Sequence, residues 1–94
     1  MKNILIFTLN GCFQCRDLKQ KLTDLSLPFT DIEITQNRKL WEQVVHQSGL
    51  DLLPTIFIQQ DTEGNGLVYT PGRDFQSTDE IIEIIKNHYI EKGD

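Results

Sequence analysis

Long apolar runs are missing from this chain of 94 residues. The apolar run nearest the N-terminus, residues 4–7, is only four residues long, whereas a membrane span needs roughly 18 apolar residues. It is also too short for the apolar region of a secretory signal, and no small-residue cleavage site follows it. The sequence therefore predicts neither a signal nor a membrane span, and we expect a cytoplasmic protein without membrane contact.

Basic residues are in the minority. The chain has 9 Lys and Arg residues against 14 Asp and Glu residues, which gives a formal net charge of -5 at pH 7. Proteins that bind nucleic acids or anionic membranes do so through basic surfaces. The acidic balance therefore argues against both classes of binding protein.

Internal repeats and low-complexity segments are absent as well. Hydrophobic residues make up 38% of the chain and charged residues 24%, which is ordinary for a folded globular protein. A chain of this length can bury one hydrophobic core but not two. We therefore predict a single domain over residues 1–94.

Cysteine is rare: the chain has only Cys12 and Cys15. A CxxC pair can close a small ring by oxidation and reopen it by reduction, which permits two-electron chemistry with a disulfide partner. In the cytoplasm such a pair is more often catalytic or metal-binding than structural. A zinc site would need two further ligands at close spacing. The two histidines of the chain, His46 and His88, lie on separate predicted helices. We therefore expect no metal at the cysteines.

The segment around the cysteines is predicted to run from a strand into a helix. Residues 3–9 are rich in Ile, Leu and Phe without alternation, which is typical of a strand covered on both faces. The Asn10-Gly11 turn follows, and from Cys12 the apolar residues recur at three- and four-residue steps. The apolar face of this helix consists of Cys15, Leu18, Leu22 and Leu25. The cysteines therefore open a helix directly after a central strand.

The middle of the chain predicts a second strand and a second helix. Residues 29–34 alternate acidic and apolar side chains, as in a strand with one face in water. Asn37 is a candidate N-cap, and Ser48-Gly49 ends the helix that follows. The apolar stripe on this helix consists of Leu40, Trp41, Val44 and Val45.

The last third predicts a hairpin and a final helix. Residues 55–58 are β-branched and aromatic, and the turn-forming residues 61–66 return the chain antiparallel to residues 67–69. Ser77 and Glu80 have the spacing of a capping box. The helix that they open buries Ile81, Ile82, Ile84, Ile85 and Tyr89. The resulting order is β-α-β-α-β-β-α, an α/β fold with a four-stranded mixed sheet flanked by three helices.

The two cysteines are predicted to have different roles. A cysteine ordinarily has a pKa of about 8.5, which helix N-termini and CxxC motifs lower. Cys12 lies at the N-terminus of its helix, so we expect it to be the attacking thiolate, and Cys15, one turn further in, to be the buried resolving thiol. Arg16, Lys19 and Lys21 either form a basic collar that favours the thiolate or are a solvated helix face. The sequence leaves these two alternatives open.

Pro54 stands at the entrance of a predicted central strand. A cis peptide there would leave the backbone of Leu53 facing outward, where it could pair with an extended substrate segment as an added strand. The alternative is an ordinary proline at the start of a strand, and the neighbouring leucines do not decide between the two.

Taken together, these motifs resemble the thioredoxin fold, and within it the glutaredoxin-like branch. The resemblance rests on the first strand, on Cys12-Phe13-Gln14-Cys15-Arg16, on Leu53-Pro54-Thr55, on Pro71-Gly72-Arg73-Asp74 and on the Ile-rich last helix. It implies that Cys12 and Cys15 are catalytic, that Phe13, Gln14 and Arg16 form the surface seen by partners, and that Leu53, Pro54 and Thr55 hold the substrate backbone. It further implies that Gly72, Arg73 and Asp74 contact glutathione.

The chain also departs from the usual glutaredoxin pattern. Glutaredoxins carry Cys-Pro-Tyr-Cys with a lysine three residues before it, where this chain has Phe13, Gln14 and Leu9. They also carry Thr-Val-Pro, where this chain has Leu52-Leu53-Pro54. Gln14 resembles instead the Cys-Val-Gln-Cys of NrdH-redoxins, which take electrons from thioredoxin reductase and pass them to ribonucleotide reductase. The resemblance thus implies either glutathione or thioredoxin reductase as electron donor.

The sequence therefore predicts a monomeric dithiol-disulfide oxidoreductase that reduces disulfide-containing proteins or glutathione mixed disulfides. No bound cofactor is expected, with glutathione at most a co-substrate, and ribonucleotide reductase is one acceptor that the resemblance implies. Two alternatives stay open. One is a redox-sensing interaction module similar to arsenate-reductase-like regulators. The other is a glutaredoxin that binds an iron-sulfur cluster between two chains through Cys12 and glutathione.

Overall fold

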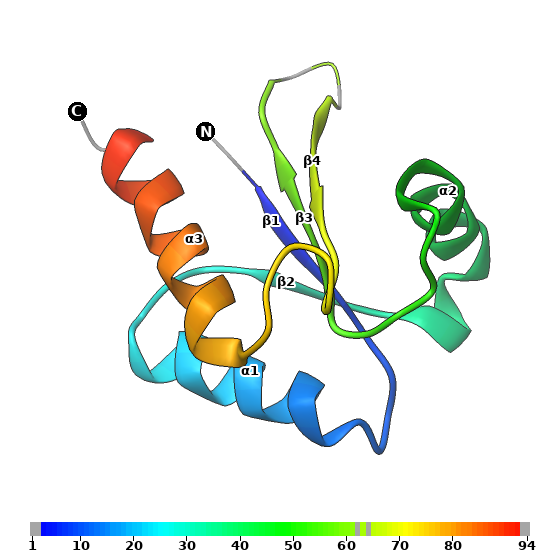
Figure 1. Cartoon of the computed structure of the whole chain (residues 1–94), viewed down its shortest axis with the longest axis horizontal. Coiled ribbons are helices and arrows are strands. Elements are labelled where there is room, and N and C mark those ends of the chain that lie inside the picture. Colours follow the sequence, from blue (N-terminus) through cyan, green and yellow to red (C-terminus); the bar gives the residue numbers. More distant parts are fainter. Residues whose placement is uncertain (1–2, 62, 64, 93–94) are drawn as a thin grey trace.

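The computed structural model describes residues 3–61, 63 and 65–92, and for residues 89–92 it describes the backbone alone. It contains a four-stranded mixed sheet and three α-helices, which confirms the predicted fold class (Figure 1). In chain order the elements are β1 (Ile4–Thr8), α1 (Phe13–Asp24), β2 (Thr30–Glu33), the 3-10 turn η1 (Ile34–Gln36), α2 (Arg38–Ser48), β3 (Thr55–Gln59), β4 (Gly66–Tyr69) and α3 (Thr78–Lys92).

The strand order β2-β1-β3-β4 places β1 and β3 in the centre of the sheet. β1 runs parallel to β2 and antiparallel to β3, and β3 forms the predicted hairpin with β4. Phe7 pairs with Thr55 at the end of the β1–β3 ladder. The loop after β1 carries Cys12, and the loop before β3 carries Pro54. Both loops therefore lie at the same end of the two central strands.

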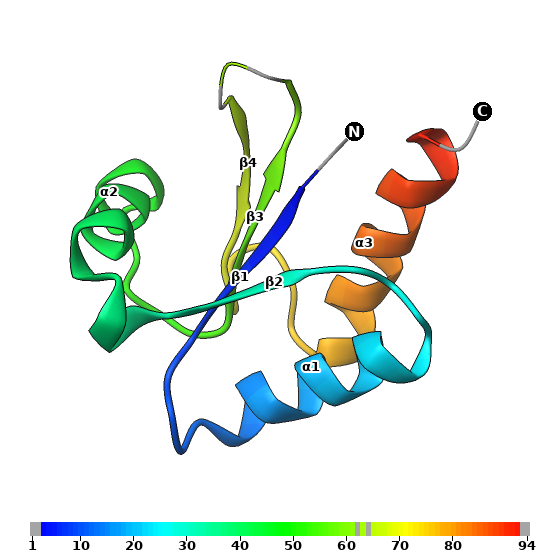
Figure 2. The same cartoon turned by 180° about the vertical axis from the view of Figure 1, so that it is seen from behind.

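The core lies between the sheet and the pair α1 and α3, which share one face while α2 covers the other (Figures 1 and 2). Strand side chains alternate between the two faces, so Ile4 and Ile6 point to α1 and α3, and Phe7 meets Trp41 of α2 with 5.6 Å between the ring centroids. The residues of the main core are Ile4, Ile6, Leu18, Leu22, Ile56, Ile58, Phe75, Ile81, Ile82 and Ile85. None of the helices, over their described residues, combines the length and the apolar character that a bilayer crossing requires.

Several expected details differ from the structure. The apolar spacing predicts Leu25 in the buried face of α1, but it lies beyond the last helical residue as the C-cap and is 48% exposed. Leu40 is predicted in the buried stripe of α2 and is 38% exposed. Ile34 is predicted in β2 and instead begins η1. The side chain of Tyr89 lies outside the described residues.

Two helix ends follow the sequence signals. Gly49 ends α2 in the left-handed conformation with φ 81°, which glycine adopts without steric cost. At the start of α3, the Ser77 hydroxyl accepts the backbone N–H of Glu80 at 3.3 Å, and the Glu80 carboxylate accepts the backbone N–H of Gln76. These contacts fix the segment before α3, which forms one wall of the site described below.

Candidate active site

Cys12 is the N-cap of α1, as the sequence predicts. Gly11 turns the chain with φ 90°, and the backbone N–H of Cys12 donates to Leu9 at 3.0 Å. The Cys12 Sγ then accepts the backbone N–H of Cys15 at 3.3 Å. This places the sulfur among the unpaired N–H groups of a helix N-terminus, where negative charge is favoured by roughly 0.3 to 2 kcal/mol.

Cys12 and Cys15 form a disulfide with their Cα atoms 5.3 Å apart. Cys12 is partly exposed, whereas Cys15 is 1% exposed and packs with the buried face of α1. A disulfide exchanges by in-line attack of a thiolate on an accessible sulfur. An outside thiol or disulfide can therefore reach the sulfur of Cys12 but not that of Cys15.

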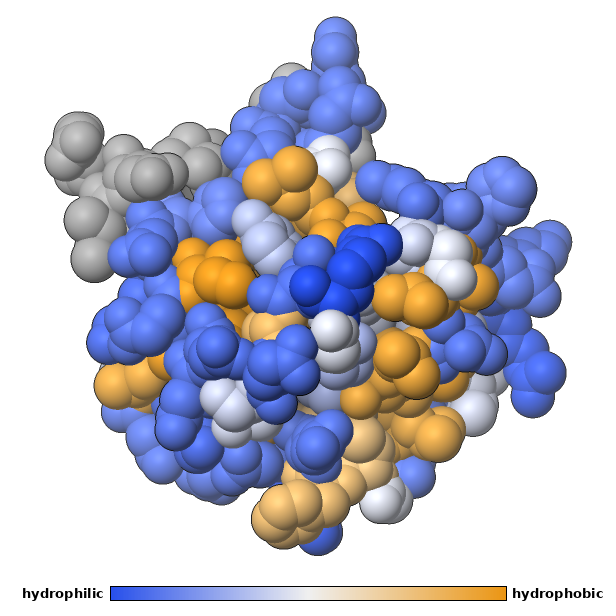
Figure 3. Space-filling model, in the orientation of Figure 1, coloured by the Kyte–Doolittle hydropathy of each residue, from blue (hydrophilic) through white to orange (hydrophobic). Residues whose placement is uncertain are grey.

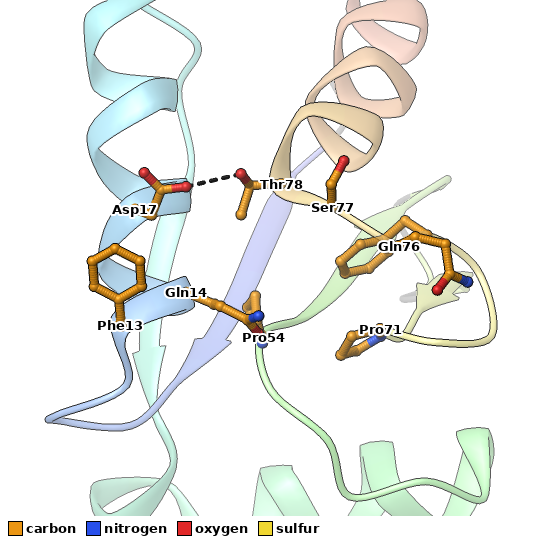
Figure 4. A pocket seen from close by; sticks show the side chains of 9 residues that line it. Phe13, Gln14, Asp17, Pro54, Pro71, Gln76, Ser77 and Thr78 are labelled. Atoms are coloured by element: carbon orange, nitrogen blue, oxygen red, sulfur yellow. Dashed lines mark hydrogen bonds between the residues drawn. The ribbon is translucent and has the colours of Figure 1, made fainter.

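A groove of about 300 Å³ includes Phe13 and Gln14, the two residues between the cysteines, in its lining (Figure 4). One wall comes from the first turns of α1 and the other from the start of α3 and the segment before it, with Pro54 at the base (Figure 4). Its lining consists of Phe13, Gln14, Asp17, Pro54, Pro71, Phe75, Gln76, Ser77 and Thr78. The groove thus adjoins the reactive pair and is large enough for one or two substrate side chains.

Exposed apolar side chains lie on the loops next to the disulfide. Phe13 is 70% exposed, and Leu9 and Leu52 are also exposed on the neighbouring loops. In the space-filling view, apolar surface runs from the loop before α1 toward the segment between α2 and β3 (Figure 3). Contiguous exposed apolar surface of this kind is typical of a partner-binding face.

Pro54 follows a cis peptide bond from Leu53 and is buried in the floor of the groove. Thr55 is buried, and its hydroxyl donates to the carbonyl of Leu52. In the described part of the chain, the backbone N–H and C=O of Leu53 make no hydrogen bond. These two groups are the ones that the sequence analysis expected to pair with a substrate strand.

Arg16 and Lys19 lie on the other side of the disulfide, where they line a pocket of about 180 Å³ together with Cys12 and Cys15. Lys19 is paired with Asp31, with 2.8 Å between Nζ and Oδ2. Burial would raise the pKa of Asp31, but hydrogen bonds from Lys19 and Thr8 hold it below its ordinary value. The basic collar considered from the sequence is therefore partly neutralised on this side.

Lys21 does not belong to that collar, because it is held between Asp17 and Asp79. Its Nζ lies 3.2 Å from Asp17 Oδ2 and 3.1 Å from Asp79 Oδ1. The Thr78 hydroxyl donates to Asp17 at 2.8 Å. The hydrogen bond from Thr78, followed by that from Lys21, lowers the pKa of Asp17, and the bonds to Asp79 and Asp17 raise the pKa of Lys21. This cluster joins α1 to the start of α3 along the rim of the groove.

Gly72, Arg73 and Asp74 lie in the turn after β4 and are not among the residues that line the groove. The Arg73 guanidinium donates to the carbonyls of Ser48 and Val68, at 2.8 and 3.4 Å, and pairs with Asp74 at 2.9 Å. Asp74 also accepts the backbone N–H of Thr70 at 2.8 Å. Burial would raise the pKa of Asp74, but Arg73 and the Thr70 N–H lower it overall. Both side chains thus hold the turn together.

Sequence reasoning missed most of the groove. Six of its nine lining residues are not predicted for that role from the sequence: Asp17, Pro71, Phe75, Gln76, Ser77 and Thr78. Asp17 follows Phe13 by four residues and so shares its helix face, which is the one local signal that could have found it. Among the described residues, no group of three or more His, Cys, Asp or Glu side chains is placed to hold a metal, and His88 lies 3.2 Å from the Tyr69 hydroxyl.

A redox disulfide at the start of a helix, beside a cis-proline loop of a four-stranded mixed sheet, defines a thioredoxin-fold protein with a dithiol site. Solved structures agree on the fold: thioredoxin from Malassezia sympodialis superposes with a TM-score of 0.63 at 13% identity, over 93% of this chain and 76% of the thioredoxin. Spinach chloroplast thioredoxin f gives 0.61 at 18% identity, over 92% and 74%.

The glutaredoxin family model matches residues 4–62, more than half of the chain, and the chain belongs to this family. A curated relative from Bacillus subtilis (strain 168), N-acetyl-S-hydroxy-L-cysteine reductase, is 25% identical over 65 residues, which cover 69% of this chain and 70% of the relative. Together with the Cys12–Cys15 pair, these findings confirm the predicted activity class. The protein is a thiol-disulfide oxidoreductase with disulfide substrates and a reductant partner.

Proposed function

We propose that the protein reduces protein disulfides by a dithiol mechanism in which Cys12 attacks and Cys15 resolves. The observation that carries this proposal is the contrast between the two sulfurs. Cys12 is partly exposed and caps the helix N-terminus, while Cys15 is buried one turn behind it. A nucleophile needs access and a favoured thiolate, and a resolving thiol needs only to reach the nucleophile.

The cycle balances without a bound cofactor. The Cys12 thiolate attacks one substrate sulfur, the substrate S–S bond breaks, and the released substrate thiolate takes up a proton. Cys15 then loses its proton and attacks Cys12 Sγ, which breaks the mixed disulfide and frees the second substrate thiol. The substrate gains two electrons, and the Cys12–Cys15 disulfide waits for an external dithiol donor.

Substrate binding is assigned to the surface around the disulfide. The backbone of Leu53, which pairs with none of the described residues, would hydrogen-bond to an extended substrate segment as an added strand. Phe13 and Gln14 would contact the residues that flank the substrate cystine, because both line the groove beside Cys12. This arrangement favours a polypeptide substrate, which can use all of these contacts, over a small disulfide that contacts only the sulfur of Cys12.

The electron donor is proposed to be a thioredoxin-reductase-type dithiol enzyme, with ribonucleotide reductase as a candidate acceptor. Two positions support this choice. Gln14 resembles the NrdH-redoxin motif, and Leu9 stands where glutaredoxins carry a lysine. Arg73 points to Ser48 and Val68, and no cation is among the described residues lining the groove, so the carboxylates of glutathione have little to pair with. Glutathione is then a slow co-substrate, contacted at most by Gly72, Arg73 and Asp74.

A second candidate function comes from the Bacillus subtilis relative, whose name describes reduction of an S-hydroxycysteine derivative. The same chemistry would serve it. Cys12 attacks the sulfur of the S–OH group, water leaves with the transferred proton, and Cys15 then closes the disulfide and frees the cysteine thiol. The groove of about 300 Å³ would admit an acylated cysteine.

The two donors and the two substrate classes are separated by one coupled assay. Oxidation of NADPH would be followed with glutathione plus glutathione reductase, or with thioredoxin reductase, using a peptide disulfide and an S-hydroxycysteine derivative in turn, with Cys12→Ser as the blank. We expect turnover of the peptide disulfide that is faster with thioredoxin reductase. Fast turnover with glutathione alone would contradict the proposed donor, and turnover in Cys12→Ser would contradict the proposed nucleophile.

A further inference from the structure

The groove beside the disulfide has one aromatic and one acidic contact on the same wall. Phe13 and Asp17 lie one turn apart on α1 and both border the groove, with Asp17 directed toward Thr78 across it (Figure 4). The ring of Phe13 is 70% exposed. An aromatic ring with a carboxylate one helical turn away can bind a Lys or Arg side chain. The aliphatic stem packs on the ring, and the charged end reaches the carboxylate.

The charge of the groove is negative. Among the described residues that line it, Asp17 is the only charged one. Lys21 does not cancel it, because Lys21 is shared with Asp79, and these three groups sum to one negative charge. Both interactions use the Oδ2 atom of Asp17, and Oδ1 makes no hydrogen bond in the described part of the chain. Asp17 is ionised at neutral pH like an ordinary Asp, and the hydrogen bonds from Thr78 and Lys21 lower its pKa further.

Nearby cations are directed elsewhere. Arg16 and Lys19 line the pocket on the other side of the disulfide. Arg73 is bound to backbone carbonyls of α2 and β4. The one cation paired with Asp17 is Lys21, which is shared with Asp79. A cationic substrate side chain in the groove therefore meets a net negative charge, whereas an anionic side chain there meets net repulsion.

The geometry points to a substrate preference for disulfides whose reactive half-cystine has a Lys or Arg neighbour, with that side chain lying along Phe13 and its charge beside Asp17. This inference deepens the proposed function and rests on it. Asp17 acts as a specificity-determining residue and takes no part in the thiol exchange itself. Because the site is open to solvent, the preference is expected to be about three- to tenfold.

The test compares short peptides that differ in one residue. Each carries a single cysteine as its 2-pyridyl disulfide, with Lys, Gln or Glu next to the cysteine, and release of the pyridinethione is followed by absorbance with reduced protein. A neighbouring charge also changes the intrinsic reactivity of a disulfide. Each rate is therefore divided by the rate of the same peptide with 2-mercaptoethanol, a small neutral thiol.

The wild type is expected to prefer the Lys peptide over the Glu peptide by about three- to tenfold, and the preference should shrink in about 1 M salt. Asp17→Asn should bring the ratio close to one. Asp24→Asn, which removes the same charge from the far end of α1 outside the groove, should leave it unchanged. Because each ratio is taken within one variant, a general loss of activity does not affect it.

A wild-type ratio near one, or a ratio that Asp17→Asn leaves intact, would overturn the inference while the proposed function stands. Asp17→Lys gives a second check, since it should reverse the order and favour the Glu peptide. If the wild type reduces none of the three peptides faster than the Cys12→Ser variant, then the proposed function fails and the inference fails with it.

Discussion

At the scale of single residues, the site depends on where one sulfur stands relative to one helix end. Cys12 Sγ accepts the backbone N–H of Cys15 and has Arg16 in the adjoining pocket. Lys19, the other cation of that pocket, is already paired with Asp31. We therefore expect the helix N-terminus to stabilise a Cys12 thiolate most, with a smaller contribution from Arg16, which forms no ion pair with the described residues.

We predict that the pKa of Cys12 in the reduced protein lies below the ordinary value of about 8.5, because the helix N-terminus favours the anion. Arg16→Gln should raise that pKa by about 0.2 to 0.5, since Arg16 is exposed and screened by solvent. The measurement is the rate of alkylation by iodoacetamide against pH. Arg38→Gln, at the start of α2, is the matched control. An alkylation midpoint at or above 8.5 would contradict this account.

Several site residues could be predicted from the sequence, and others could not, for a physical reason. Cys12, Phe13, Gln14 and Pro54 belong to local patterns, a CxxC after a strand and a proline before one. The remaining groove residues come together only because α1 packs against α3. Asp17 and Thr78 are 61 positions apart in the chain, yet they share a hydrogen bond. Helix periodicity alone does not identify which helices meet.

At the scale of elements, the packing of α1 on α3 holds the two walls of the groove. Leu18 of α1 and Ile81 of α3 are fully buried in the same core. Leu18→Ala should lower the free energy of unfolding by about 2 to 5 kcal/mol, because it leaves a cavity. Leu25→Ala, at the exposed C-cap of the same helix, should change it by less than about 0.5 kcal/mol. Urea unfolding measures both, and equal losses would contradict the observed packing.

The turn after β4 depends on Asp74, which pairs with Arg73 and accepts the Thr70 N–H. We predict that Asp74→Asn lowers the free energy of unfolding at pH 7 by about 0.5 to 1.5 kcal/mol. Its lowered pKa means that this stabilisation is present above about pH 3.9, the pKa of an unfolded Asp, and is lost as pH falls through the folded value.

The difference between wild type and Asp74→Asn should therefore shrink below about pH 3.9. Chemical denaturation at several pH values checks this, with Glu42→Gln on the exposed side of α2 as control. A gap that stays constant down to pH 2 would mean that the carboxylate of Asp74 does not hold the turn.

Strands and helix starts could be predicted from the sequence more accurately than the extent to which each helix face is covered. The uninterrupted apolar run of β1 and the β-branched run of β3 mark central strands. Leu25 continues the apolar spacing of α1, but the helix has already ended at Asp24. Leu40 continues the apolar stripe of α2, but its side chain is exposed. Periodicity indicates which side chains share a face, and tertiary contacts decide how far that face is covered.

At the scale of the whole molecule, the net charge is -5, but the charged side chains are unevenly distributed around Cys12 and Cys15. Arg16 and Lys19 lie on one side of the disulfide and Asp17 on the other. Phe13, next to Cys12 in the chain, and Leu52, on the loop that carries Pro54, are exposed apolar residues of the same face. A partner that docks on this face is therefore oriented by charge and held by apolar contact, which suits a protein substrate.

The central claim is that Cys12 attacks and Cys15 resolves, and trapping of the mixed disulfide tests it most directly. Reduced Cys15→Ser and Cys12→Ser proteins would each be mixed with a peptide disulfide and analysed by intact mass and peptide mapping. The account predicts a one-to-one peptide adduct on Cys12 in Cys15→Ser and no comparable adduct in Cys12→Ser. An adduct that forms equally fast on Cys15, or none on Cys12, would contradict it.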